Sequence, residues 1–205
     1  AYNERGSAQA AKGRNDRAIA DFDQALRLNP NSDVAYNNRG QAYLAAGDQG
    51  RAIADFDRAI KLNGSFATAF HHRGLAQYAR GDHDRAIADL SQAIKLDSSD
   101  VAALSDRGMA YGAKGDNERA IKDFDQVIRV DANNAMAFNN RGIAYRNQGK
   151  YDRAIEDFDA AIKLKPDYAL AMYNRGTAFY DKLDYDRAIA SFDQVIKLDP
   201  GNVLA

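Results

Sequence analysis

The sequence predicts an all-α fold, a solenoid of stacked antiparallel helix pairs, and three observations support this prediction. Glycine returns every 34 residues along the chain, a period typical of repeated supersecondary units. Apolar and small residues recur at helical spacing in both halves of each period. The residues around the glycine recur with it, so the chain holds six copies of one unit. The repeated glycines are Gly6, Gly40, Gly74, Gly108, Gly142 and Gly176.

The first half of each unit predicts a helix that approaches its partner closely. In the fifth unit Phe138, Gly142 and Tyr145 share one helical face. A glycine inside a helix costs about 1 kcal/mol against alanine, so its recurrence indicates a contact that leaves no room for a side chain. An arginine precedes every one of these glycines: Arg5, Arg39, Arg73, Arg107, Arg141 and Arg175.

The second half predicts an amphipathic helix. Its apolar stripe in the fifth unit includes Ala154, Ile155 and Phe158. An acidic residue lies in the first turn of this helix in most units, and a basic residue lies in its last turn in every unit. Negative charge at the start and positive charge at the end both interact favourably with the helix dipole. A second glycine comes seven residues after the first in five units, with Leu183 in the sixth.

This pattern resembles the tetratricopeptide repeat (TPR) family. The resemblance covers essentially the whole chain, and it departs from the family at the arginine, where leucine is usual. It implies a right-handed superhelical α-solenoid with a concave inner groove, and a non-catalytic role in binding proteins. The matching positions of the fifth unit are Phe138, Gly142, Tyr145, Gly149, Ala154, Phe158, Ala161 and Pro166.

The repeat predicts one TPR solenoid domain over residues 1–205. Its last three residues begin a seventh helix, which indicates either a piece of a longer protein or an apolar face on the last helix that another chain covers. The units span residues 1–32, 33–66, 67–100, 101–134, 135–168 and 169–202, with the start of the seventh helix at 203–205.

Composition excludes several classes of function. The 28 basic and 29 acidic residues give a net charge of −1, so nucleic-acid binding is not expected. The absence of cysteine excludes disulfides and thiolate metal sites. No apolar run is long enough to span a membrane. A soluble protein is therefore expected, cytoplasmic, or periplasmic or secreted if an upstream signal segment has been removed.

No cluster of residues predicts an enzyme, a cofactor or a metal site. The chain shows no Ser/His/Asp grouping, no paired carboxylates in a cleft and no phosphate-binding glycine loop. His71 and His72 are adjacent, so their side chains point about 100° apart on a helix and cannot easily share one ion.

The arginines are expected to pair with aspartates across the contact between successive units, because an unpaired buried charge is costly. The alternative is a ladder that binds an anionic ligand. A second acidic column is expected to form solvated i,i+4 pairs with Arg17, Arg51, Arg85, Arg119 and Arg153 on the convex side: Asp21, Asp55, Asp89, Asp123 and Asp157. The expected cross-unit pairs are Arg39 with Asp23, Arg73 with Asp57, Arg141 with Asp125 and Arg175 with Asp159, while Arg107 faces Ser91.

The polar side of each first helix is expected to line the groove. These residues vary between units while the packing residues do not, and they mix carboxamides, which suit a peptide main chain, with apolar side chains. The expected peptide-binding residues are Asn37, Asn38, Gln41, Leu44, His71, His72, Leu75, Tyr78, Met109, Asn139, Asn140, Ile143, Arg146, Tyr173, Asn174, Thr177 and Tyr180.

Three functions are compatible with these observations. The first is an interaction scaffold that binds a peptide segment or a helix of a protein partner in the groove. The second is a self-assembly module whose uncapped terminal helices stack end to end. The third is the regulatory arm of a larger protein. The identity of the partner does not follow from the residues.

Overall fold

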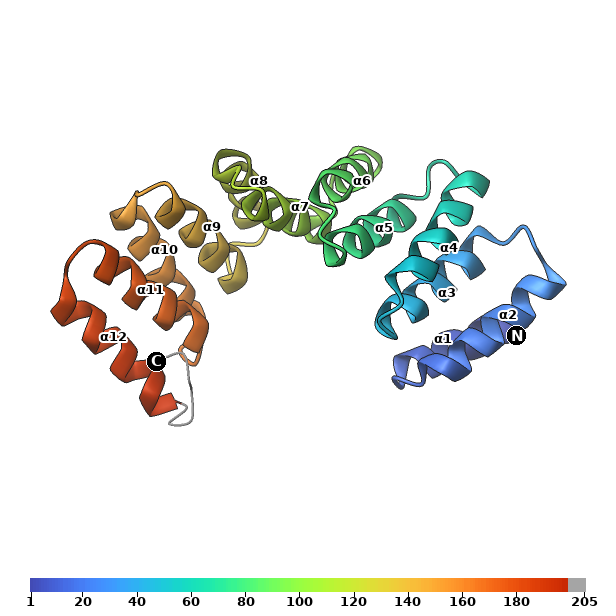
Figure 1. The fold of residues 1–205 in the computed structure, drawn as a ribbon, viewed down its shortest axis with the longest axis horizontal. Helices are drawn as coiled ribbons and strands as arrows, with labels where there is room; N and C mark the ends of the chain where they lie inside the picture. Colours follow the sequence, from blue (N-terminus) through green and yellow to red (C-terminus); the bar gives the residue numbers. More distant parts are fainter. Residues whose placement is uncertain (199–205) are drawn as a thin grey trace. The chain divides into compact units, whose positions relative to one another are not determined.

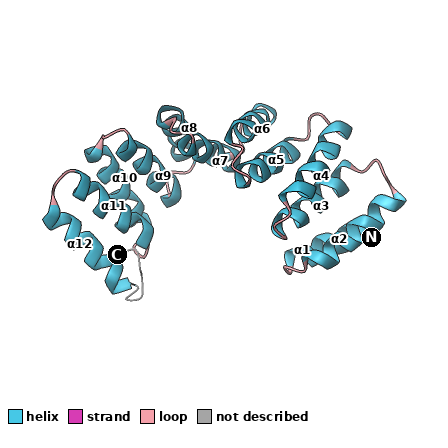
Figure 2. Ribbon diagram, viewed as in Figure 1, coloured by secondary structure: helices cyan, strands magenta, loops and turns pink. Residues whose placement is uncertain are grey.

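The computed structural model describes residues 1–198, which form twelve α-helices and no strand (Figures 1 and 2). The all-α fold is as the sequence predicts, and the expected seventh helix at 203–205 lies outside the described residues. The helices are α1 (Tyr2–Ala11), α2 (Asn15–Leu28), α3 (Asp33–Ala45), α4 (Gln49–Leu62), α5 (Ala67–Ala79), α6 (His83–Leu96), α7 (Val101–Ala113), α8 (Asn117–Val130), α9 (Ala135–Asn147), α10 (Tyr151–Leu164), α11 (Ala169–Asp181) and α12 (Tyr185–Leu198).

The chain forms two compact units, Ala1–Ala110 and the residues from Tyr111 onward. In the first, α1 pairs with α2, α3 with α4 and α5 with α6, while α2 packs on α3 and α4 on α5. In the second, α9 pairs with α10 and α11 with α12, while α8 packs on α9 and α10 on α11. A second helix such as α10 therefore lies between the first helix of its own repeat and the first helix of the next.

The recurring glycine marks the contact within a helix pair, as predicted. A Cβ atom built on Gly40 would lie 2.6 Å from Cε1 of Phe56, a ring that is fully buried in the partner helix. Gly142 faces Phe158 in the same way, at 2.7 Å. The mid-helix glycine therefore allows the aromatic ring of the second helix to lie against the backbone of the first.

The turn inside each helix pair also depends on backbone conformation. The second residue after each first helix has a positive φ, between 69° and 82° at Gly13, Gly47, Gly81, Gly115 and Gly149. This left-handed conformation ends a helix at little cost only when the residue is glycine. In the last helix pair Leu183 adopts this left-handed conformation instead, with a φ of 64°.

Three of the inner arginines, Arg39, Arg73 and Arg141, each bind two aspartates. Arg39 donates from Nη1 to Asp23 of the preceding repeat at 2.6 Å, which confirms the predicted cross-unit pair. It also donates from Nε and Nη2 to Asp55 of its own repeat, both at 2.7 Å. Arg73 and Arg141 repeat this arrangement, and we call the three the arginine clamps. Arg175 reaches Asp159 and Arg107 reaches Ser91, as predicted.

The prediction for the second acidic column is wrong. Asp55 accepts from Arg39 rather than lying in solvent with Arg51, which instead binds Asp48. The antiparallel return of the chain brings the residue 16 positions after the arginine beside its guanidinium, and a bidentate bond there is stronger than an exposed i,i+4 pair. The whole column is buried: Asp21, Asp55, Asp89, Asp123 and Asp157.

Candidate functional site

The inner side of the first helices carries a ladder of polar contacts between successive repeats. A side chain three residues before the recurring glycine of one repeat bonds to the side chain two residues before the glycine of the next. The spacing along the chain is therefore 35 residues. We call these contacts the inner ladder: Asn3 with Asn38 at 3.2 Å, Asn37 with His72 at 2.9 Å, His71 with Asp106 at 2.7 Å and Asn139 with Asn174 at 2.9 Å.

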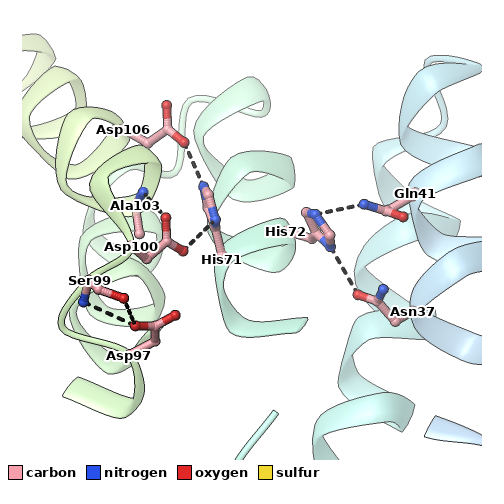
Figure 3. Close-up of polar contacts among 9 residues, drawn as sticks. All are labelled: Asn37, Gln41, His71, His72, Asp97, Ser99, Asp100, Ala103 and Asp106. Carbon is pink, nitrogen blue, oxygen red and sulfur yellow. Dashed lines mark hydrogen bonds and ion pairs between the residues drawn. The ribbon is translucent and has the colours of Figure 1, made fainter. Parts of the chain in front are cut away.

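His71 lies between two carboxylates (Figure 3). Its Nε2 is 2.7 Å from Asp106 and its Nδ1 is 3.1 Å from Asp100, so both ring nitrogens donate when the imidazole is charged. Burial alone lowers the pKa of His71, but the hydrogen bond to Asp106 and the charge of Asp100 outweigh it, and the net pKa is raised. The two carboxylates therefore favour the charged form of this ring.

His72 has the opposite character although it is the next residue. Its Nδ1 donates to the Asn37 oxygen at 2.9 Å, and its Nε2 accepts from Gln41 at 2.7 Å (Figure 3). Burial, together with the charge of His71, lowers the pKa of His72 to about 4. The ring is therefore neutral at pH 7. Within residues 1–198 no histidine or carboxylate group is arranged to hold a metal ion.

The predicted groove residues fall into three groups by exposure. Asn37, Asn139 and Asn174 are buried in the inner ladder, and their side chains bond to neighbouring first helices. Gln41 and Tyr180 are exposed. The remaining members are half-buried: Asn38, Leu44, His71, His72, Leu75, Tyr78, Met109, Asn140, Ile143, Arg146, Tyr173 and Thr177.

Sequence reasoning missed exposed apolar side chains at one equivalent position of three first helices. Val34, Met136 and Leu170 lie in the first turns of α3, α9 and α11, and are 45%, 58% and 49% exposed. Residues at i, i+3, i+4 and i+7 share a helical face, so Met136 is on the face of Asn139 and Asn140. The shared position, six residues before the repeated glycine, was the signal that could have found these side chains.

A second missed feature is an ion pair between first helices of the second unit. Arg146 of α9 donates from Nε to Asp181 of α11 at 2.6 Å, again 35 residues on. Arg146 is one of the expected peptide-binding residues. Its charge is balanced by Asp181, so the inner side of α9 and α11 presents carboxamides and apolar groups rather than a net charge.

Comparison with protein families decides the identity of the repeats. Tetratricopeptide repeat models match residues 105–169, 139–203 and 34–66, and a TPR repeat model matches residues 6–47 and 76–115. The chain belongs to the tetratricopeptide repeat family. This family is generally a non-catalytic scaffold for protein–protein interaction, and this TPR chain has the corresponding fold. No curated protein matches the sequence at a significant level.

Solved structures share the fold of this TPR chain at low sequence identity. PilF of Pseudomonas aeruginosa has a TM-score of 0.83 at 16% identity, over 99% of this chain and 92% of that one. MamA of Desulfovibrio magneticus RS-1 has a TM-score of 0.78 at 20% identity, over 83% of this chain and 97% of that one. YrrB is described as a TPR protein with an unusual peptide-binding site. It has a TM-score of 0.74 at 22% identity, over 89% of this chain and 94% of that one.

No helix in residues 1–198 of the TPR chain combines the length and the apolar character needed to cross a membrane.

Proposed function

We propose that the chain binds an extended peptide segment of a protein partner along the inner side of α9 and α11. The observation that carries the proposal is the pair of exposed apolar side chains Met136 and Leu170 beside the inner ladder of the second unit. Burying an apolar side chain against a ligand is favourable by roughly 25 cal/mol per Å² of surface removed from water. Thr68 and Ala102 hold the same position in α5 and α7 and are also exposed, so packing between repeats does not require a large apolar side chain there.

The polar groups next to Met136 and Leu170 suit a peptide main chain. Asn139 donates to the Asn140 oxygen at 3.1 Å, which fixes the Asn140 carboxamide and leaves its Nδ2 without a hydrogen-bond partner among residues 1–198. A carboxamide held in one orientation can donate to a peptide carbonyl at a small entropic cost. Tyr180, also exposed, adds an aromatic surface on α11, next to the ring of Tyr185 at 5.4 Å.

The neutral balance of this surface favours an uncharged segment. The Arg146–Asp181 pair cancels the two formal charges on the inner side of α9 and α11. A peptide with apolar side chains at alternate positions would place them on Met136 and Leu170 while its main chain meets Asn140. The ligand class we expect is therefore an extended, apolar-rich segment rather than one recognised by its charge.

The test is a peptide selection followed by three substitutions. A random peptide library is selected on the chain, and the affinity of an enriched peptide is measured by fluorescence anisotropy. We expect Leu170→Ser and Asn140→Ala each to weaken binding about 5- to 10-fold, the loss of about 1 kcal/mol that marks an interface residue. Leu28→Ser is the matched control, because Leu28 is an exposed leucine of α2, outside the first helices.

Two outcomes contradict the proposal. One is a selection that enriches no peptide. The other is an enriched peptide whose affinity falls equally for Leu28→Ser and Leu170→Ser, or for neither, since the binding surface then lies elsewhere.

A further inference from the structure

Four contacts between one repeat and the next join the arginine of a first helix to an aspartate of the preceding second helix, and Ser91 takes the place of the aspartate in the fifth. At the junction of α10 with α11, Arg175 donates from Nη1 to Asp159 at 2.6 Å. Ala178 is fully buried and packs on Ala154 and Phe158, with Ile155 partly buried against them. This junction needs a small residue and a cation on the first helix, and an apolar stripe and an anion on the second.

The α1 helix carries the first-helix residues of this junction, but no second helix of a preceding repeat packs against them among residues 1–198. The Arg5 side chain is 63% exposed, against 16% for Arg175. Arg5 binds Asp21 through Nε and Nη2, but its Nη1, the atom that reaches the preceding repeat in Arg39, has no partner among residues 1–198. Ala8 is exposed, whereas its counterparts are almost fully buried: Ala42, Ala76, Ala144 and Ala178.

The α12 helix carries the other half. Ile189 and Ile196 are 59% and 44% exposed, although the counterpart of Ile189 in α10, Ile155, is packed into a cluster. Asp193 is exposed and has no hydrogen bond or ion pair among residues 1–198, whereas its counterpart Asp159 binds Arg175. The exposed groups are the ones that inner repeats use to hold a following first helix.

We propose that the α12 face formed by Ile189, Asp193 and Ile196 binds α1 of a second copy of this chain. Asp193 would accept from the free Nη1 of Arg5, and Ala8 would lie against the isoleucines. A second copy is the partner that fits, because α1 carries Arg5 and Ala8 at the positions where α11 presents Arg175 and Ala178 to α10. The proposal is separate from peptide binding, because the inner side of the first helices takes no part in it.

The two faces are different surfaces, so the contact is heterologous. Such an interface does not pair two copies symmetrically but adds them head to tail, into chains or closed rings. The measured mass should therefore rise with concentration beyond that of a dimer. This behaviour separates the proposal from a symmetric contact between two α12 helices.

The first test compares adjacent positions of α12. Sedimentation experiments from low micromolar to several hundred micromolar should show wild-type mass rising above the 22.5 kDa of one chain. We expect Ile189→Glu to weaken association at least 10-fold. Ala190→Glu is the matched control and should associate like the wild type, because its counterpart Glu156 is an exposed glutamate of α10.

The second test uses complementation. Ala8→Glu blocks the α1 face and Ile189→Glu blocks the α12 face, so each variant alone should stay at 22.5 kDa. An equal mixture restores one intact pair of faces and should give a dimer of twice that mass and nothing larger. Both residues are exposed, and circular dichroism checks that each variant is folded.

Three outcomes overturn the inference: a wild type that stays monomeric throughout, an Ile189→Glu variant that associates like the wild type, or a mixture that forms no dimer. Leu170→Ser, which removes a residue proposed for peptide binding, should leave association unchanged. Failure of peptide binding and failure of self-association therefore give different results.

Discussion

Arg141 and Asp157 are joined by two parallel hydrogen bonds, from Nε to Oδ2 at 2.8 Å and from Nη2 to Oδ1 at 2.6 Å. The third nitrogen of the same guanidinium reaches Asp125 of the preceding repeat at 2.6 Å. One side chain thus fastens two second helices to the first helix between them. Arginine can do this where lysine cannot, because its planar fork presents separate donors in fixed directions.

The two aspartates of an arginine clamp should contribute unequally to stability. The Asp157 side chain is 7% exposed and that of Asp125 is 41% exposed. We expect Asp157→Asn to lower the free energy of unfolding by about 2–3 kcal/mol, because it weakens a buried bidentate pair. Asp125→Asn should cost less than about 1 kcal/mol, since water screens that pair. Urea unfolding of both variants measures the difference, and equal losses would contradict the unequal roles.

His72 should make the protein less stable in mild acid. Its folded pKa of about 4 lies below the value of about 6.5 expected in the unfolded chain. The unfolded state therefore binds the proton first, and stability falls as pH drops from about 6.5 to about 4, by up to about 3 kcal/mol. His72→Asn keeps a ladder partner for Asn37, because asparagine holds this position in other repeats, and it should remove this acid-side loss. Urea unfolding at pH 7 and pH 5 for both proteins tests the prediction. A loss that persists unchanged in the variant would refute it.

His71 should make the protein less stable as the pH rises above about 6.5. Its pKa is raised in the folded state, where Asp106 and Asp100 flank the ring. The stability that this charge contributes is complete below about pH 6.5 and is lost as pH rises through the folded pKa. His71→Asn should flatten the decline above pH 6.5 and should leave the part of the acid-side loss that the burial of His72 causes. NMR titration of the two imidazoles assigns each pH dependence to its residue, and a folded pKa below 6.5 for His71 would be incompatible with this account.

Leu183 should be replaceable by glycine with a gain in stability. Its φ of 64° is the left-handed conformation that the other repeats give to glycine, and a residue with a Cβ is strained there by roughly 1–2 kcal/mol. After the greater flexibility of unfolded glycine is subtracted, Leu183→Gly should stabilise the protein by about 1 kcal/mol. The reciprocal change, Gly149→Leu, should destabilise it by a similar amount. Thermal unfolding of both variants checks the pair, and a loss of stability in Leu183→Gly would count against the strain.

The candidate site was only partly accessible from sequence. The variation of the inner residues indicates which helices carry the candidate site, because polar and apolar positions alternate with a helical period that any one repeat displays. The partners of those residues did not follow. Asn139 bonds to Asn174, 35 residues on, and this pairing depends on how far one first helix is rotated and shifted against the next. A helical wheel of a single repeat contains no such information.

The sequence by itself determined the helix pairs, the glycine contact and the cross-unit bond from Arg39 to Asp23. These depend on the 34-residue period and on side-chain size and charge, which are properties of the chain. Only the tertiary structure decided that Asp55 is buried against Arg39 instead of exposed beside Arg51. Both partners are compatible with the position of Asp55 on its helix. The antiparallel packing of α3 on α4 selects Arg39, because it places the guanidinium where two bonds form out of water.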